Sequence, residues 1–358
     1  MRIALVSDTY TPQVNGVTTV LRRIVQAIGA ARHHAAVVAP DYPNLQPDTR
    51  ANELRVPSVA FPPYPAIRLS LPVPRRVAHF LDRFEPDLVH VATEGPLGIL
   101  GRRYALRRGI PLVTSFHTNF AQYCRHYGVG ALEPAVWRFL KWFHGPALLT
   151  QTPGEAVSDT LRAHGIRRPV VWGRGVDTAR YNPARRDRVW RRRLGAADGS
   201  AIVLHVGRLA PEKNLDVLVE AWTLAHGALG SRALFVIAGD GPGARDVALR
   251  MPWALHFGFL STETLSTLYA SAELCVLPSA TETCGLVALE AMASGLPVVA
   301  ADAGGFRETV EHGRNGVLVA PADSHAFAAA ISDLVLHPSA RAAMGAAARA
   351  TAVARDSA

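Results

Sequence analysis

The stretch that decides the fold covers residues 272–292 and reads AELCVLPSATETCGLVALEAM. It opens with a strand-length run that ends at Leu277, breaks at Pro278, and continues after Gly285 as an apolar helical pattern. The order strand, loop, helix is the unit from which parallel sheets covered by helices are built. The stretch therefore predicts an α/β fold with a ligand site where this strand ends.

Two carboxylates, Glu282 and Glu290, flank the start of the predicted helix. The N–H groups of Gly285, Leu286 and Val287 would point out of the helix N-terminus, where an anion such as phosphate is favoured. Carboxylates are poor partners for phosphate but good acceptors for hydroxyls. The pattern suits a nucleotide sugar, which has hydroxyls on both sides of its phosphates. The alternative is two ordinary solvent-exposed glutamates, since most surface carboxylates have no special role.

A second strand-to-helix turn carries cations. Residues 205–214 read HVGRLAPEKN and lie between an apolar strand pattern and an apolar helical run. Arg208 and Lys213 at this turn could clamp a diphosphate. The chain has 36 arginines and only two lysines, Lys141 and Lys213. A lysine in such a background suggests that a compact ammonium is needed at that place, although chance is the alternative.

Together these residues resemble a known family. The pair Glu282 and Glu290, with Gly207-Arg208 and Lys213, resembles the retaining glycosyltransferases of glycosyltransferase family 4. The resemblance covers nearly the whole chain, and its other parts are residues 1–17, 115–120 and 173–178. Within the family, residues 117–120, 123–127 and 172–178 are most similar to lipid-directed hexosyltransferases. These include bacterial GDP-mannose-dependent α-mannosyltransferases and sulfoquinovosyl diacylglycerol synthases.

The resemblance implies the GT-B architecture, in which two Rossmann-like, doubly wound parallel-sheet domains face each other across a cleft. We expect an acceptor-side domain at residues 1–168 and a nucleotide-sugar-binding domain at residues 169–358. The length of 358 residues and the apolar fraction of 49% agree with two cores. Strand-like runs alternate with helical stretches, which predicts parallel sheets. These runs lie at 3–6, 35–38, 88–91 and 112–115, and again near residues 201, 233, 274 and 298.

The resemblance also implies an activity: a retaining hexosyltransferase that moves mannose from GDP-mannose to a lipid-linked or glycolipid hydroxyl. It implies that Glu282 holds the transferred sugar, Glu290 the ribose, and that His117 approaches the donor sugar. The implied catalytic residues are His117, Arg208, Lys213 and Glu282, and the implied donor-binding residues are Asn15, Gly16, Gly207, Gly285, Leu286, Val287 and Glu290. Alternatives are transfer from UDP-glucose or another UDP-hexose, a non-catalytic nucleotide-sugar binder, and a sugar-nucleotide epimerase or hydrolase.

Metal and cofactor chemistry is not expected. The sequence contains no Asp-x-Asp motif of the kind that bridges a metal to a diphosphate in another class of glycosyltransferase. Its three cysteines, Cys124, Cys275 and Cys284, lack metal-ligand spacing and are expected to be free thiols. Arg208, Lys213 and the helix N-terminus would take the place of the metal, with the nucleotide sugar as co-substrate.

The formal charge of +9 requires an anionic partner or reflects composition alone. No recognition helix, zinc module or RNA-binding aromatic signature is present, so nucleic acid is not the expected partner. Residues 72–81 and 136–143 mix cations with bulky apolar groups and favour peripheral contact with an anionic membrane. Their apolar residues also fit the buried face of a helix. No long apolar run or signal peptide is found, so we expect a cytoplasmic protein at the inner face of the membrane.

The carboxyl end departs from the family pattern. Family members usually continue with a tryptophan-containing stretch and a last helix that crosses back onto the first domain. Here the sequence stops at Ala358 without that tryptophan. We expect the crossing helix to be missing or shortened and the coupling between the domains to be weaker.

Overall fold

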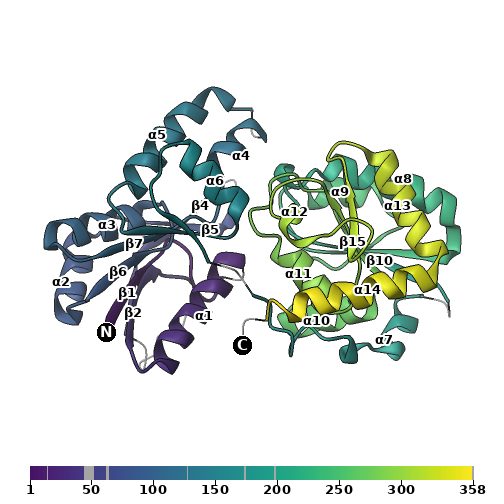
Figure 1. Cartoon of the computed structure of the whole chain (residues 1–358), viewed down its shortest axis with the longest axis horizontal. Helices are drawn as coiled ribbons and strands as arrows, with labels where there is room; N and C mark the ends of the chain where they lie inside the picture. Colours follow the sequence, from purple (N-terminus) through teal and green to yellow (C-terminus); the bar gives the residue numbers. More distant parts are fainter. Residues whose placement is uncertain are drawn as a thin grey trace. The chain divides into compact units, whose positions relative to one another are not determined.

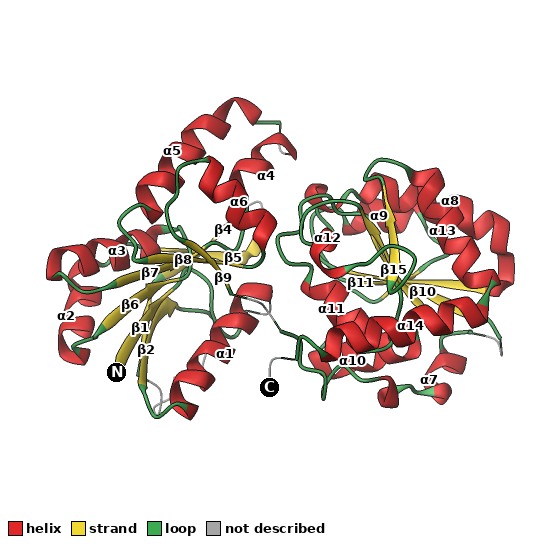
Figure 2. Ribbon diagram, viewed as in Figure 1, coloured by secondary structure: helices red, strands yellow, loops and turns green. Residues whose placement is uncertain are grey.

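The computed structural model describes residues 1–13, 15–43, 52–61, 64–126, 128–172, 175–196 and 199–356. The chain divides into two compact units (Figure 1). Unit 1 comprises Met1–Arg125 and Val129–Trp172, and unit 2 comprises His126–Gly128 and Gly173–Ala358. Each unit contains its own parallel sheet with helices packed against it, as Figure 2 shows. The predicted α/β class is therefore confirmed.

The sheet of unit 1 has seven parallel strands in the order β3-β2-β1-β6-β7-β8-β9. The chain begins in β1, builds outward to β3, and then returns to place β6 on the other side of β1. In such a doubly wound sheet, ligands bind at the carboxyl ends of the strands, next to the point where the winding reverses. The strands are β1 (Arg2–Val6), β2 (His34–Pro40), β3 (Glu53–Val56), β6 (Leu88–Val91), β7 (Leu112–Ser115), β8 (Leu149–Thr152) and β9 (Pro169–Val171).

The helices of unit 1 begin and end where local chemistry favours it. Asn15 caps α1, and proline stands in the first turn of α2, α3 and α5, where its missing N–H costs nothing. An antiparallel pair, β4 (Ser58–Phe61) and β5 (Tyr64–Ser70), lies outside the main sheet. The helices are α1 (Gly16–Ala30), α2 (Pro74–Phe84), α3 (Pro96–Arg108), α4 (Phe120–His126), η1 (Gly130–Leu132), α5 (Glu133–His144) and α6 (Glu155–Ala163).

The sheet of unit 2 has six parallel strands in the order β12-β11-β10-β13-β14-β15. They are β10 (Ala201–Val206), β11 (Ala233–Ala238), β12 (Leu255–His256), β13 (Leu274–Leu277), β14 (Val298–Ala301) and β15 (Gly316–Val319). The helices are η2 (Pro183–Arg185), α7 (Arg188–Arg193), η3 (Pro211–Lys213), α8 (Leu215–Leu229), η4 (Gly230–Arg232), α9 (Ala244–Arg250), α10 (Thr262–Ser271), α11 (Leu286–Ala293), α12 (Phe306–Thr309), α13 (Ser324–Leu336) and α14 (Pro338–Val353). All eight predicted strand positions lie in strands of the two sheets.

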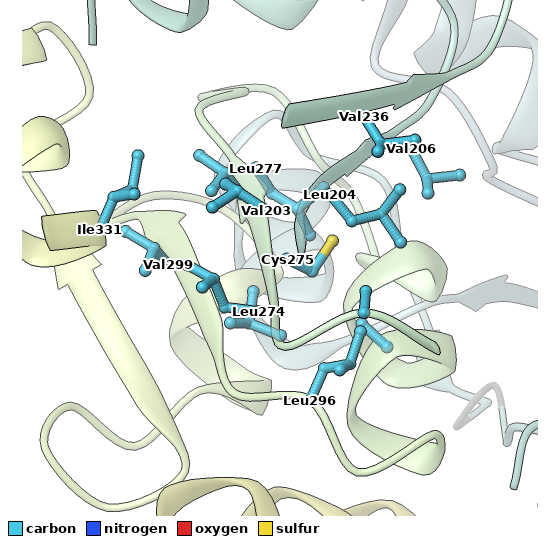
Figure 3. Close-up of a cluster of buried hydrophobic side chains, with 14 of the residues drawn as sticks. Val203, Leu204, Val206, Val236, Leu274, Cys275, Leu277, Leu296, Val299 and Ile331 are labelled. Carbon is cyan, nitrogen blue, oxygen red and sulfur yellow. The ribbon is translucent and has the colours of Figure 1, made fainter. Parts of the chain in front are cut away.

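The core of unit 2 explains why its strands read as continuous apolar runs. Every residue of β10, β13 and β14 is buried, as expected for a parallel sheet covered on both faces. Figure 3 shows part of this core, with the register partners Leu204 of β10 and Cys275 of β13. Each fully buried aliphatic side chain contributes roughly 1.5–3 kcal/mol to folding. The central strands therefore form a rigid base for the loops at their ends.

The longest helix of the described chain, α14, has 16 residues. Among the described residues, no helix combines the length and the apolar character needed to span a bilayer.

Candidate active site

Two loops of unit 2 meet because their strands are neighbours. β10 and β13 pair in parallel, so the loops that follow Val206 and Leu277 leave the same edge of the sheet. Side chains then tie the loops together. Asn214 Nδ2 donates to the carbonyl oxygen of Pro278 at 3.0 Å, and Thr281 Oγ1 donates to that of Glu212 at 3.0 Å. The two motifs recognised separately in the sequence thus lie together in the structure.

Lys213 and Glu282 form the centre of this site. Lys213 Nζ donates a hydrogen bond to Glu282 Oε1, and the side chains are 18% and 21% exposed. The structure therefore joins these two predicted residues in one ion pair instead of presenting them singly. An incoming phosphate would compete for the ammonium group, and a hydroxyl for the carboxylate.

Arg208 is paired as well, with a residue that the sequence analysis did not single out. Its Nη2 donates to Oε1 of Glu212, whose side chain is completely buried. Glu212 follows Arg208 by four residues, and this spacing of opposite charges could have indicated the ion pair. Gly207 precedes the pair, and its N–H donates to the carbonyl oxygen of Ala238 at 3.1 Å. This bond fixes the first turn of the loop against the neighbouring strand.

The predicted anion site lies at the start of α11. Gly285 adopts a left-handed conformation with φ of 67°, and a Cβ there would lie 2.9 Å from the ring of Phe306. Glycine is therefore required both for the backbone and for the space. Its carbonyl oxygen accepts from the N–H groups of Ala288 and Leu289. Leu286 and Val287 occupy the first turn, where backbone N–H groups have no acceptor within the helix.

A glycine pair after β14 holds the main chain of Glu282 in place. Gly305 N–H donates to the carbonyl oxygen of Glu282 at 2.8 Å. Gly304 has φ of 51°, and a Cβ there would lie 2.4 Å from the same oxygen. This support was not predicted. Two consecutive glycines after a predicted strand could have indicated a tight turn at this place.

Glu290 lies one helical turn inside α11. The hydroxyl of Tyr269 donates to Glu290 Oε2 at 3.3 Å. Burial, and then the charge of Glu290, raise the pKa of Tyr269 well above its usual range, so the phenol keeps its proton. Glu290 is partly exposed, and a carboxylate has more acceptor positions than one phenol can occupy.

Beneath the Lys213–Glu282 pair lies a neutral histidine. His205 Nδ1 is 2.9 Å from the carbonyl oxygen of Val276, and burial lowers the pKa of His205 to about 4. The imidazole is therefore uncharged at neutral pH and donates through Nδ1. It adds no second cation under Lys213.

In unit 1, Asn15 and Gly16 lie at the start of α1. Asn15 Oδ1 accepts from the N–H of Thr18 at 2.8 Å, and its Nδ2 donates to Thr9 Oγ1 at 2.9 Å. Gly16 is the first residue of the helix. The asparagine thus serves as an N-cap and joins the helix to the loop after β1.

His117 follows β7 and is 8% exposed. The preceding residue, Phe116, is anchored by its N–H, which donates to the carbonyl oxygen of Gln151 at 2.8 Å. The ring of Phe116 packs against His144, and His144 Nε2 lies 3.4 Å from Oε1 of the buried Glu94. The sequence analysis did not find the pair Glu94 and His144, because the two residues are 50 positions apart and no motif joins them.

The predicted residues form two groups. Asn15, Gly16 and His117 belong to unit 1, and the others to unit 2. Within the described ranges, no three histidine, cysteine or acidic side chains form a group that could hold a metal ion. Cys124, Cys275 and Cys284 are free thiols, as expected.

Comparison with known proteins identifies the family of this chain. Residues 14–180 match the model of Glycosyltransferase Family 4, and residues 187–351 match that of Glycosyl transferases group 1. The GDP-mannose-dependent alpha-mannosyltransferase of Mycolicibacterium smegmatis is 37% identical over 342 residues, which cover 94% of this chain and 88% of that protein. The enzyme of the same name from Corynebacterium glutamicum is 33% identical over 97% of this chain and 84% of its own length.

Solved structures show the same fold. Anabaena HepE in complex with UDP-glucose superposes with a TM-score of 0.78 at 24% identity, over 99% of this chain and 95% of that chain. WaaG, a glycosyltransferase involved in lipopolysaccharide biosynthesis, superposes with a TM-score of 0.74 at 19% identity, over 99% and 96% of the two chains. The architecture is therefore GT-B, as predicted. The chain belongs to glycosyltransferase family 4, and it is a hexosyltransferase.

Proposed function

We propose that the protein transfers mannose from GDP-mannose to a hydroxyl of a lipid-linked or glycolipid acceptor, with retention of the anomeric configuration and without a metal ion. The observation that carries this proposal is the Lys213–Glu282 pair beside the N-terminus of α11. It provides adjacent groups for a phosphate and for sugar hydroxyls. The mannosyl donor is favoured because similar proteins are named as GDP-mannose-dependent enzymes.

The positive groups of unit 2 are suited to the leaving diphosphate. Transfer breaks the bond between the anomeric carbon and a phosphate oxygen, and negative charge grows on that oxygen. Arg208, Lys213 and the first-turn N–H groups of Leu286 and Val287 would stabilise this charge. In the structure, Arg208 is paired with Glu212 and Lys213 with Glu282. When the diphosphate takes Lys213 as partner, Glu282 becomes available for hydroxyls of the mannose.

Glu290 is suited to the ribose. One of its oxygens accepts from Tyr269, and a carboxylate can accept from several hydroxyls, so Glu290 would also hold the two vicinal ribose hydroxyls. Its place on α11, eight residues after Glu282, would separate the nucleoside end of the donor from the sugar end. The diphosphate would lie between them, at the start of the helix.

From unit 1, His117 would contact hydroxyls of the donor sugar, and Asn15 and Gly16 would line the phosphate and acceptor end. We propose front-face substitution for the retention of configuration. The acceptor oxygen bonds to the anomeric carbon on the face from which the phosphate departs, and the departing phosphate oxygen takes the acceptor proton. No covalent enzyme intermediate is needed in this scheme.

A lipid acceptor implies contact with the inner face of the membrane, and α5 offers one suitable surface. Trp142 is 48% exposed, and the guanidinium of Arg102 stacks 4.0 Å from its ring centroid. Leu140 and Phe143 of the same helix are buried, so only part of the predicted segment 136–143 is available. In the predicted segment 72–81, Val77 and Leu81 are buried in the core of unit 1.

The test is release of nucleoside diphosphate from GDP-mannose and from UDP-glucose, with and without a glycolipid acceptor in vesicles. The proposal predicts GDP release that depends on the lipid and is unaffected by EDTA. Product NMR should show an α-linkage. If UDP is released from UDP-glucose but no GDP from GDP-mannose, the donor is a UDP-hexose. Release without acceptor would indicate a hydrolase. Binding of the nucleotide sugar without release would indicate a non-catalytic binder. Each of these three results would overturn the proposal.

A further inference from the structure

A cavity lies in unit 2 at the edge of the sheet opposite to the proposed donor site. It has a volume of about 460 Å³ and opens at the amino ends of β13 and β14, where Glu273 and Leu296 lie in its wall. Helix α14 forms another side, with Arg341 and Arg349. None of the proposed catalytic or donor-binding residues lines it. We call it the amino-end pocket.

The amino-end pocket carries an excess of positive charge. Its wall contains three guanidinium groups, from Arg186, Arg341 and Arg349, and a single carboxylate, Glu273. That carboxylate is already held by Arg186 and by Arg191, whose Nη1 lies 2.8 Å from it. Among the described residues, neither Arg341 nor Arg349 forms an ion pair with a carboxylate. Partly buried cations without a counter-ion are unfavourable unless an anion or main-chain carbonyls compensate them.

Main-chain carbonyls compensate Arg349, whose Nη1 donates to Tyr181 and Ala293 and whose Nη2 donates to Thr178. They compensate Arg341 only in part. Its Nη1 donates to the carbonyl oxygens of Leu334 and Val335, at 2.7 and 3.0 Å, at the end of α13. Its Nε and Nη2 donate no hydrogen bond to the described residues. These two nitrogens form the edge of a guanidinium that binds a phosphate or carboxylate through two parallel hydrogen bonds. Hydrogen bonds to the end of α13 therefore use one nitrogen of the Arg341 guanidinium group, and Nε and Nη2 remain for a ligand.

Ser294 is a second unsatisfied group in the same wall. It is 3% exposed, and its Oγ has no hydrogen-bond partner among the described residues. A buried hydroxyl without a partner costs about 1–3 kcal/mol, which makes this part of the wall locally unfavourable. Much of the remaining wall is apolar, from Ala270, Leu296, Pro297 and Ala342. The pocket thus combines an anion-binding part with an apolar part.

We propose that the amino-end pocket binds a small organic phosphate. The phosphate would accept from Nε and Nη2 of Arg341, with Arg186 and Arg349 adding positive charge in the same wall, and the organic part would contact Leu296 and Pro297. The volume lies within the usual range for small-molecule sites, about 300–1,000 Å³. Occupancy would link α14 to the turn before β14 and so stabilise unit 2. This inference does not rest on the proposed transfer reaction, because it concerns binding at the other edge of the sheet.

The experiment is thermal unfolding of the full chain with inorganic phosphate and with phenyl phosphate as probes. A ligand that binds only the folded state raises the melting temperature with its concentration. We expect phenyl phosphate to give the larger rise, because it also fills the apolar part. Arg341→Met should weaken binding at least tenfold, and the exposed Arg314→Met should leave it unchanged.

Lys213→Ala separates this pocket from the proposed donor site. The proposal predicts that Lys213→Ala keeps the phenyl phosphate response. It would be overturned if Lys213→Ala abolished the response or if Arg341→Met retained it in full. Should Arg341→Met fail to fold, Ala342→Trp provides the second variant, because Ala342 is exposed in the pocket wall and the indole would fill the space. An undiminished response in Ala342→Trp would equally overturn the proposal.

Discussion

The two units place their predicted functional residues at the ends of similar parallel sheets, but they hold them in different ways. In unit 2 the charged residues are paired, Lys213 with Glu282 and Arg208 with Glu212. In unit 1, Asn15 is fixed as a helix cap and His117 by burial at the end of β7. A ligand of unit 2 must therefore exchange ionic partners, whereas a ligand of unit 1 meets polar groups that are already in position. Substitutions in the two units should accordingly have different effects.

The largest effect is expected from the ion pair of unit 2. Lys213→Ala and Glu282→Ala should each lower kcat/KM by roughly 100-fold or more, since each removes a group proposed to bind the reacting part of the donor and leaves its partner uncompensated. Because the two side chains are in contact, the double variant should lose less than the product of the single losses. Steady-state kinetics of the three variants measure this.

The exposed pair Arg307 and Asp302 in the same unit provides the control, and Arg307→Ala should keep normal turnover. Near-normal rates in both Lys213→Ala and Glu282→Ala would remove the basis for the site in unit 2.

The next effect concerns unit 1. His117→Ala should lower kcat by up to about 100-fold, comparable with the loss of one transition-state hydrogen bond. Binding of GDP alone should change little, because the nucleotide-binding groups are proposed to lie in unit 2. His79, exposed on α2, is the matched control, and His79→Ala should behave as the wild type. A His117→Ala variant that lost GDP binding but kept kcat would reverse the proposed division between the units.

Acid should destabilise both units, because each contains a buried histidine. Burial lowers the pKa of His90 and of His205 to about 4, below the usual 6.5. The unfolded chain therefore takes up protons first as the pH falls. Stability is complete above about pH 6.5 and is lost toward pH 4, by on the order of 3 kcal/mol for each histidine.

Urea unfolding between pH 4 and 7 measures this dependence. His90→Phe should reduce the pH dependence of unfolding in unit 1, and His205→Phe that in unit 2. An unchanged slope in both variants would show that these histidines are not the origin of the acid sensitivity.

A smaller effect is expected at Gly304. Gly304→Ala places a Cβ 2.4 Å from the carbonyl oxygen of Glu282, in addition to the strain of a positive φ. The matched control is Gly313→Ala, which also has a positive φ but no atom within 4 Å of the new Cβ. The control should cost about 1 kcal/mol of stability, and Gly304→Ala roughly twice as much, together with a lower turnover. Equal stability and turnover in the two variants would show that the loop of Glu282 does not depend on Gly304.

The sequence predicted the local features of both units. The strands follow directly from apolar runs such as Ala201–Val206, because a strand buried on both faces is mostly apolar. The start of α11 followed from Gly285 and the apolar pattern after it. These features are local, and local patterns are visible in one sequence.

What the sequence did not show depends on contacts between distant residues. Lys213 and Glu282 were each singled out, but their ion pair appears only once β10 and β13 are neighbours. The pair Glu94 and His144 and the support from Gly304 have the same origin. Such contacts follow from the order of strands in the sheet, which no single motif encodes.

The most direct test of the central claim is calorimetric titration of GDP-mannose into the wild type and into Lys213→Ala. The account predicts binding to the wild type and a loss of affinity of at least tenfold in the variant, since the proposed phosphate partner is removed while the rest of unit 2 is kept. The contradicting result is equal affinity of the two proteins for GDP-mannose, because the ion pair of unit 2 would then not be part of the donor site.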